Sequence, residues 1–146
     1  MTDMFRGRRA DMNADWEAAL AGRLPMLLTG PARTTDDWIR HMQPRLAPPV
    51  IEVACDADLK TTALDDAGTV VLHDVEHLRH ADQQRLLRWL EARRQRPPII
   101  STSSLALYPL VGAGRFSENL YYRLNTVYLD CTYPDDHRPR SVTAFR

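Results

Sequence analysis

Short apolar stretches alternate along the chain with longer stretches in which apolar residues recur at helical spacing. Each apolar stretch is four or five residues long and is bounded by turn-forming residues, often prolines. This alternation is typical of a parallel sheet whose strands are joined by crossover helices. The five predicted strands cover residues 26–29, 50–54, 69–72, 99–102 and 126–129.

Helical periodicity predicts the elements between the strands. The predicted helices include residues 11–24, 81–94 and 117–124. Another helix follows the first strand, with Trp38, Ile39 and Met42 on its apolar face. Thr34 is its predicted N-cap, with Asp37 three residues later, because this pairing resembles a capping box.

Composition and charge narrow the possible partners. The chain has 146 residues, with 19 Lys+Arg and 19 Asp+Glu, so its formal net charge is zero. A neutral chain has no global field that attracts nucleic acid or an anionic membrane, so we expect neither direct DNA binding nor membrane binding. Cys55 and Cys131 have no CxxC spacing, which favours a reducing compartment, and we expect the protein to be cytoplasmic.

The most specific motif lies in the C-terminal third. Residues 114–125 read GRFSENLYYRLN, and residues 68–78 read GTVVLHDVEHL. Three shorter motifs lie at Leu27–Gly30, Val53–Cys55 and Gln84–Glu91. Together they resemble the ATPase domain of sigma-54-dependent transcription activators, an AAA+ family. The resemblance covers roughly residues 25 to 130 and implies a three-layer α/β sandwich with a five-stranded parallel sheet of order 5-1-4-3-2.

The phosphate loop that the resemblance implies is degenerate. Such a loop reads GxxxxGK[ST], and its lysine reaches the phosphates. From Gly30 the chain reads GPARTTDD, so Thr35 replaces the second glycine, Asp36 replaces the lysine and Asp37 follows. At about 4 Å and an effective dielectric near 20, exchanging the lysine for an aspartate turns an attraction of about 4 kcal/mol per phosphate charge into a similar repulsion. We therefore expect ATP and magnesium binding to be lost.

Other functional parts of the family are also altered. His73-Asp74 stands where the family has Asp-Glu for magnesium and water activation, and Ser117 replaces the first of two candidate finger arginines. Only 12 residues separate Cys55 from Gly68, too few for the loop with which the family contacts sigma-54. The helical lid and the DNA-binding domain that usually follow are not expected in this sequence. No catalytic residue is predicted.

These changes predict a protein without ATPase activity. We divide the chain into an N-terminal helical segment (1–24), a degenerate AAA+-like core (25–131) and a tail (132–146). The leading hypothesis is a module that acts by protein contact in transcriptional regulation, with an intact AAA+ activator or itself as the partner. The alternative is a weak sensor of nucleotide or another phosphate ligand.

Several residues admit more than one interpretation. Arg115 and Arg123 are predicted at a protein interface, although Arg123 could equally form an internal salt bridge. Tyr121 and Tyr122 are expected to pack the last helix on the sheet rather than to stack on bases. The His73–His80 stretch lacks the HExxH pattern, so we expect a polar loop and no metal.

Overall fold

Five parallel strands form one sheet at the centre of the protein. The computed structural model describes residues 2–92 and 96–132, with side chains from Met12 onward. The strands are β1 (Met26–Thr29), β2 (Val50–Ala54), β3 (Thr69–His73), β4 (Ile99–Ser103) and β5 (Val127–Asp130). Their order is β2-β3-β4-β1-β5 and every pairing is parallel, which confirms the predicted topology.

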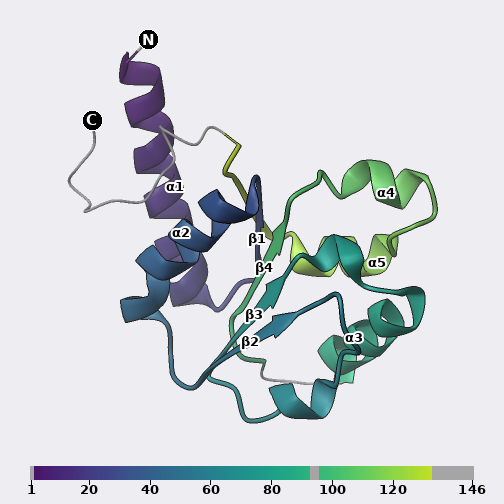
Figure 1. Cartoon of the computed structure of the whole chain (residues 1–146). Helices are drawn as coiled ribbons and strands as arrows, with labels where there is room; N and C mark the ends of the chain where they lie inside the picture. The colour runs from purple at the N-terminus through teal and green to yellow at the C-terminus, as the bar shows by residue number, and fades with distance from the viewer. Residues whose placement is uncertain (1, 93–95, 133–146) are drawn as a thin grey trace.

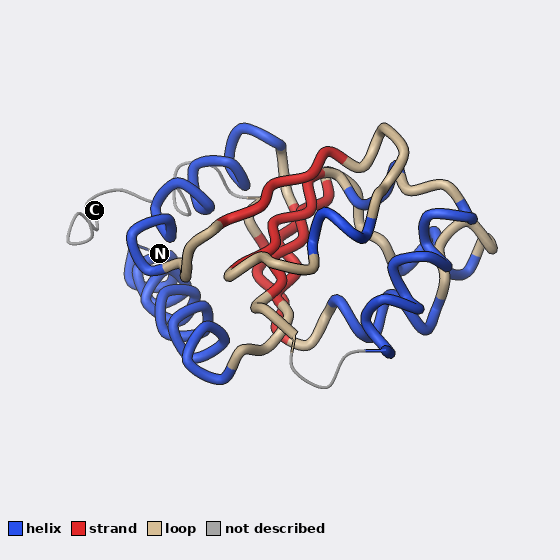
Figure 2. The backbone as a smooth tube through the Cα atoms, turned by 90° about the horizontal axis from the view of Figure 1, so that it is seen from below, coloured by secondary structure: helices blue, strands red, loops and turns tan. Residues whose placement is uncertain are grey.

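Helices cover both faces of the sheet. The α-helices are α1 (Thr2–Gly22), α2 (Ala32–Met42), α3 (His80–Ala92), α4 (Tyr108–Gly112) and α5 (Glu118–Leu124), with 3-10 turns at Gln43–Arg45, Thr61–Leu64 and Val75–His77. α1 and α2 lie on one side of the sheet, and α3, α4 and α5 lie on the other (Figures 1 and 2). The three-layer sandwich is therefore confirmed.

Alternating residues of the strands pack into two separate hydrophobic cores, one on each face of the sheet. Val70 and Leu72 of β3 pack with α3 and α5, whereas Val71 between them packs with α1 and α2. Successive side chains of a strand point to opposite faces, so a strand covered on both sides must be apolar throughout. This requirement explains why the strands read as continuous apolar runs.

The start of α2 differs from the prediction. The helix begins at Ala32 with Pro31 at the N-cap position, and Thr34 lies inside the first turn, buried. The amides of Thr34 and Thr35 both donate to the Pro31 carbonyl, at 2.9 and 3.0 Å. The predicted Thr34 cap was wrong because helical hydrogen bonding already begins at Pro31.

Some predictions fall partly outside the described residues. The predicted 81–94 helix is α3, and Arg93 and Arg94 are not among the described residues. Of the predicted tail, only Thr132 is described. Trp16 and Ala19 of α1 share a core with β1 and α2, while the division into three segments stays a prediction.

Candidate functional site

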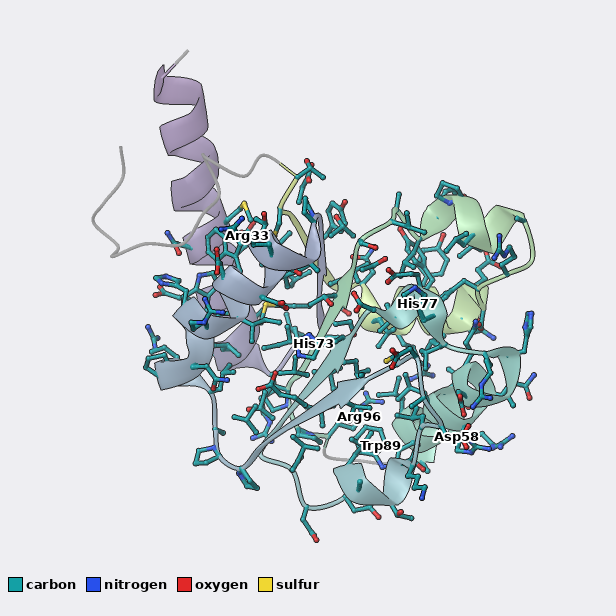
Figure 3. All side chains as sticks on the ribbon, viewed as in Figure 1. Arg33, Asp58, His73, His77, Trp89 and Arg96 are labelled. Atoms are coloured by element: carbon teal, nitrogen blue, oxygen red, sulfur yellow. The ribbon has the colours of Figure 1, made fainter. Side chains whose placement is uncertain are left out.

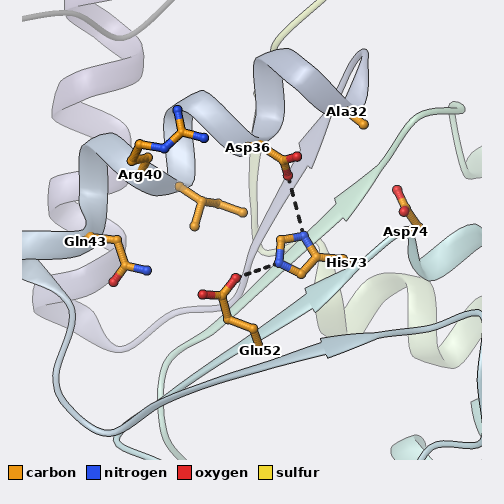
Figure 4. Close-up of a pocket in the computed structure, with 8 residues that line it drawn as sticks. Ala32, Asp36, Arg40, Gln43, Glu52, His73 and Asp74 are labelled. Carbon is orange, nitrogen blue, oxygen red and sulfur yellow. Dashed lines mark hydrogen bonds and ion pairs between the residues drawn. The ribbon is translucent and has the colours of Figure 1, made fainter.

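A polar cavity of about 470 Å³ lies between α2 and the neighbouring strands β2 and β3 (Figure 4). Its lining includes Ala32, Asp36, Ile39, Arg40, Gln43, Glu52, His73 and Asp74. Three of the predicted site residues, Asp36, His73 and Asp74, therefore meet in one cavity. β3 ends at His73, so the cavity opens at the carboxyl edge of the sheet, where parallel α/β folds place their ligands.

His73 bridges two carboxylates inside this cavity. Its Nε2 lies 2.8 Å from Glu52 Oε1, and its Nδ1 lies 3.6 Å from Asp36 Oδ1 (Figure 4). The imidazole thus links α2 to the edge strand β2 across the cavity. Sequence reasoning missed Glu52, although a single charge inside the apolar stretch 50–54 is a signal that could have identified it.

The backbone around Gly30 is tightly packed. Gly30 has a φ of 149°, and a Cβ built there would lie 2.5 Å from the Cys131 carbonyl oxygen, so only glycine fits. Its amide donates to the Ser103 carbonyl at 3.0 Å. These contacts hold the end of β1 between β4 and β5, and the Gly30 amide is already used within the protein.

The segment that aligns with a phosphate loop is mostly helix. Thr35 is buried in the first turn of α2, and its hydroxyl donates to the Ala32 carbonyl at 3.1 Å. Asp37 pairs with Arg40 at 2.8 Å. Only Gly30 and Pro31 remain between β1 and α2, so the backbone forms no wide loop there.

Asp74 directly follows β3 in an uncommon conformation. Its φ of 59° lies in the left-handed region, and its amide donates to the Thr102 hydroxyl at 3.0 Å. Desolvation, followed by the charge of Glu76, raises the pKa of the Asp74 carboxyl, while His77 and His73 oppose that rise. The site therefore disfavours a further negative charge beside Asp74.

The remaining histidines of this stretch lie outside the cavity. Figure 3 shows His73 turned toward α2, with His77 away from it. His77 closes the short 3-10 turn Val75–His77. Within residues 2–92 and 96–132, no group of three or more His, Cys, Asp or Glu side chains is arranged to hold a metal ion.

The predicted interface arginines lie on the opposite side of the sheet. Arg123 of α5 approaches Glu91 of α3 at 3.6 Å, and both side chains are about half exposed. Arg115 is exposed and makes no ion pair within the described part of the chain. Tyr121 packs against the core as predicted, but Tyr122 is 56% exposed, so its predicted packing role was wrong.

Gln83 of α3 is hydrogen-bonded to the segment that leads into α5, and this role was not predicted from the sequence. Its amide nitrogen donates to the carbonyls of Leu78 and Arg115, both at 3.0 Å, and its amide oxygen accepts from the Ser117 amide at 2.7 Å. Ser117 in turn caps α5, accepting from the Leu120 amide. A buried glutamine that pairs with three backbone groups has no signature in a single sequence.

Neither cysteine has the surroundings of a nucleophile. Burial, together with nearby carboxylates led by Asp74, raises the pKa of the Cys55 thiol to about 12. Burial also raises the pKa of the Cys131 thiol. Both thiols are therefore protonated at neutral pH, and a thiol is a far weaker nucleophile than a thiolate.

None of the helices in the described ranges is long and apolar enough to cross a membrane.

Comparisons with known proteins agree on one family. Residues 9–133 match the family described as Sigma-54 interaction domain. The Sigma54-dependent transcriptional regulator SfnR of Pseudomonas fluorescens is 35% identical over 88 residues, which is 53% of this chain and 24% of that protein. The chain thus spans about a quarter of this curated relative.

Solved structures with the same fold are more distant in sequence. NtrX from Brucella abortus in complex with ATP has a TM-score of 0.65 at 18% identity, covering 86% of this chain and 37% of that one. The P-loop NTPase domain of a sigma-54 transport activator from E. coli has a TM-score of 0.53 at 19% identity, covering 85% and 96%. The RuvB Holliday junction branch migration motor of Thermotoga maritima has a TM-score of 0.57 at 16% identity, covering 85% and 44%.

Proposed function

Because this chain belongs to the family of sigma-54 interaction domains, we propose that it is a member without ATPase activity that acts by protein contact in transcriptional regulation. The observation that carries this proposal is the start of α2 at Ala32, immediately after Gly30 and Pro31. The altered side chain of Asp36 supports the same conclusion, since it lines a cavity that also contains Glu52 and Asp74.

A phosphate loop works through its backbone amides. Amide groups that point outward from the loop bind phosphate oxygens, and a lysine adds positive charge. Here the amides of Thr34 and Thr35 are already hydrogen-bonded to the Pro31 carbonyl, and Pro31 itself has no amide hydrogen. Two of the donors that would surround the phosphates are therefore used by the helix, and a third amide is missing at Pro31.

The electrostatics of the cavity also oppose a triphosphate. The carboxylates of Asp36, Glu52 and Asp74 line it, and Arg40 is already paired with Asp37. An unscreened pair of like charges at about 4 Å repels by about 4 kcal/mol at an effective dielectric near 20. This cavity therefore offers ATP no net attraction, which disfavours the alternative of a phosphate-ligand sensor.

The connection between β2 and β3 supports the loss of the loop with which the family contacts sigma-54. It is short, and it is tied to the start and the middle of α3. Arg79 forms an ion pair with Asp58, the Arg85 guanidinium donates to the Leu59 carbonyl at 3.2 Å, and the Trp89 indole donates to Asp65 at 2.9 Å. A segment fixed in this way is poorly suited to reach out and contact sigma-54.

Without a nucleotide site, the segment from Gly114 to Arg123 is the candidate surface for contact with another protein. A planar guanidinium suits a carboxylate partner across an interface, and Arg115 has no such partner within the described residues. We assign to this segment, including Arg115 and Arg123, the contact with another protein. The partner in this proposal is a second copy or an intact activator of the same family.

Two assays test the proposal together. Purified protein should show no magnesium-dependent ATP hydrolysis and should not form open complexes at a sigma-54 promoter in reconstituted transcription. An intact activator in the same reactions serves as the positive control. Hydrolysis above a protein-free blank, or open-complex formation by this chain alone, would contradict the proposal.

A further inference from the structure

A second polar cavity, of about 550 Å³, lies between the short β2–β3 connection and the start of α3. Charged and hydroxyl side chains from both segments line it: Lys60, Thr61, Thr62, Arg79, Asp82 and Arg85. None of them lines the cavity around His73. The two cavities lie beside α2 and α3, which cover opposite faces of the sheet (Figure 1), so they are separate sites.

A buried carboxylate holds two guanidinium groups at this second cavity. The Asp82 side chain is 3% exposed, and it accepts from Arg85 at 2.5 Å and from Arg79 at 3.3 Å. A carboxylate out of water is costly unless charged donors surround it, so Asp82 keeps both arginines in place. Each guanidinium has five N–H donors, and the Arg79 and Arg85 side chains are 63% and 43% exposed. Both therefore keep donors for a ligand.

The part of the connection that carries the other donors is anchored in the core. Leu59 and Leu64 are buried in the core that includes α3. Lys60, Thr61 and Thr62 lie between these two leucines and line the cavity. Within residues 2–92 and 96–132, the Lys60 ammonium forms no ion pair and the two hydroxyls form no side-chain hydrogen bond. Among the described residues, these three side chains are therefore available to a ligand.

We propose that this cavity binds a small molecule through a phosphate group, which the Lys60 ammonium and the guanidinium groups of Arg79 and Arg85 contact. Charge-assisted hydrogen bonds to phosphate are among the stronger ones in proteins, and a guanidinium suits paired phosphate oxygens. The three cations less the Asp82 carboxylate leave two positive charges. They match a phosphate monoester, which carries about two negative charges near neutral pH. The volume of the cavity is also in the range of small-ligand sites.

Asp58 is paired with one of the cations that the phosphate needs. Its carboxylate forms an ion pair with Arg79, and its side chain is 72% exposed. An exposed ion pair contributes little to stability, so a doubly charged phosphate can displace Asp58 from Arg79. The exposed carboxylate therefore competes with the ligand, and removing its charge should strengthen binding.

This site goes beyond the proposed function. It lies apart from the start of α2 and from the segment from Gly114 to Arg123, to which the protein contact is assigned. Phosphate binding beside α3 and the absence of ATP hydrolysis are therefore independent, and either can fail without the other.

A single lysine in the sequence makes the site easy to observe. Because Lys60 is the only lysine, selective ¹⁵N-lysine labelling of the full chain gives one lysine backbone amide signal, at the cavity itself. Titration with inorganic phosphate near neutral pH should shift this signal saturably, with a Kd of about 1 mM. Sodium chloride at matched ionic strength should produce no saturable shift, and succinate, a dicarboxylate of similar charge, should bind more weakly than phosphate.

Two variants should change the affinity in opposite directions. Lys60→Gln should raise the calorimetric Kd for phosphate by about tenfold or more, because a charge-assisted contact is lost. Asp58→Asn should lower the Kd by about threefold or more, because the competing carboxylate is removed. Arg33→Gln is the matched control, since Arg33 is an exposed cation of α2 and its loss changes the net charge as Lys60→Gln does. It should leave the Kd unchanged.

Thermal melts of the same samples report any change in folding. The inference would be overturned by an unsaturable shift of the Lys60 signal, by succinate binding as tightly as phosphate, or by weaker binding in Asp58→Asn. Equal losses in Lys60→Gln and Arg33→Gln would also overturn it, because they would reflect net charge alone. A loss in Arg33→Gln only would place the phosphate at the start of α2 instead.

Discussion

The layer formed by α3 and α5 keeps most of the motif residues of the family, whereas the edge formed by α2 and His73 has replaced several of them. In the first, Gln83, Ser117 and Leu120 form a continuous hydrogen-bonded and packed unit. In the second, Asp36 and His73 border an open cavity. A substitution in a packed unit disrupts many contacts, whereas one beside open solvent disrupts few. Most of the motif residues in the packed layer are therefore those of the resembled family, Ser117 excepted, whereas the residues of the phosphate-loop and Asp-Glu positions that border the open cavity differ from it.

The largest effect should come from Gln83→Ala. Gln83 is 2% exposed and pairs with three backbone groups. Each buried group left without a partner costs about 1–3 kcal/mol, so we expect a loss of at least about 3 kcal/mol in the free energy of unfolding. Urea denaturation measures it. The neighbouring exposed glutamine gives a matched control, since Gln84→Ala should change stability by less than about 0.5 kcal/mol. If Gln83→Ala and Gln84→Ala lowered the free energy of unfolding equally, the proposed difference between the packed α3–α5 layer and the open α2–His73 edge would be contradicted.

Thr35→Gly with Asp36→Lys should destabilise the protein without restoring nucleotide binding. Thr35 is buried inside α2, where glycine is a poor helix former, and we expect a loss of about 1–2 kcal/mol. ATP binding should stay absent, because the amides at positions 34 and 35 remain bonded to the Pro31 carbonyl and Pro31 still lacks an amide hydrogen. Calorimetry and denaturation on the same variant provide both readouts. Recovery of ATP binding would show that the backbone after Gly30 can still bind phosphate and that only the side chains at positions 35 and 36 had prevented it.

Apolar periodicity predicted the strands and the main helices, and the family resemblance implied the strand order and the three layers. The sequence also identified Asp36, His73 and Asp74, which meet in one cavity. It missed Glu52 and Gln83, because their roles depend on partners at least five residues away in the chain. It also misplaced the start of α2. A threonine before an apolar helical pattern resembles an N-cap, but the preceding Pro31 carbonyl accepts the first helical hydrogen bonds.

Arg123→Ala should affect association more than stability. The Glu91–Arg123 pair is half exposed and 3.6 Å long, and such pairs contribute no more than about 0.5–1 kcal/mol. We expect the melting temperature to fall by only about 2 °C, while self-association weakens. Thermal melts and sedimentation on one sample separate the two roles. A large loss of melting temperature with unchanged association would assign Arg123 to an internal salt bridge.

The smallest effect should be a gain in stability from Asp74→Asn. The pKa of Asp74 is raised in the folded protein, so folding disfavours the ionised carboxylate. The wild-type protein therefore loses stability as the pH rises from the ordinary pKa of an aspartate to the raised pKa of folded Asp74. Asparagine removes the charge and tolerates the left-handed φ of 59°. Allowing for solvent screening, the gain at neutral pH should be below about 1 kcal/mol.

The pH dependence of that gain provides the check. The gain in stability should shrink as the pH falls below the ordinary pKa of an aspartate, because the Asp74 carboxyl is then protonated in both the folded and the unfolded protein. Denaturant titrations at several pH values measure it. A destabilised Asn variant at neutral pH would mean that the ionised Asp74 carboxylate is needed in this cavity.

Calorimetric titration of the wild-type protein with ATP and magnesium tests the central claim most directly. The first turn of α2 uses the amides of Thr34 and Thr35, and the cavity beside it is lined by the carboxylates of Asp36, Glu52 and Asp74. We predict no affinity tighter than about millimolar, equivalent to about 4 kcal/mol of binding free energy. Micromolar binding, with or without turnover, would contradict the account.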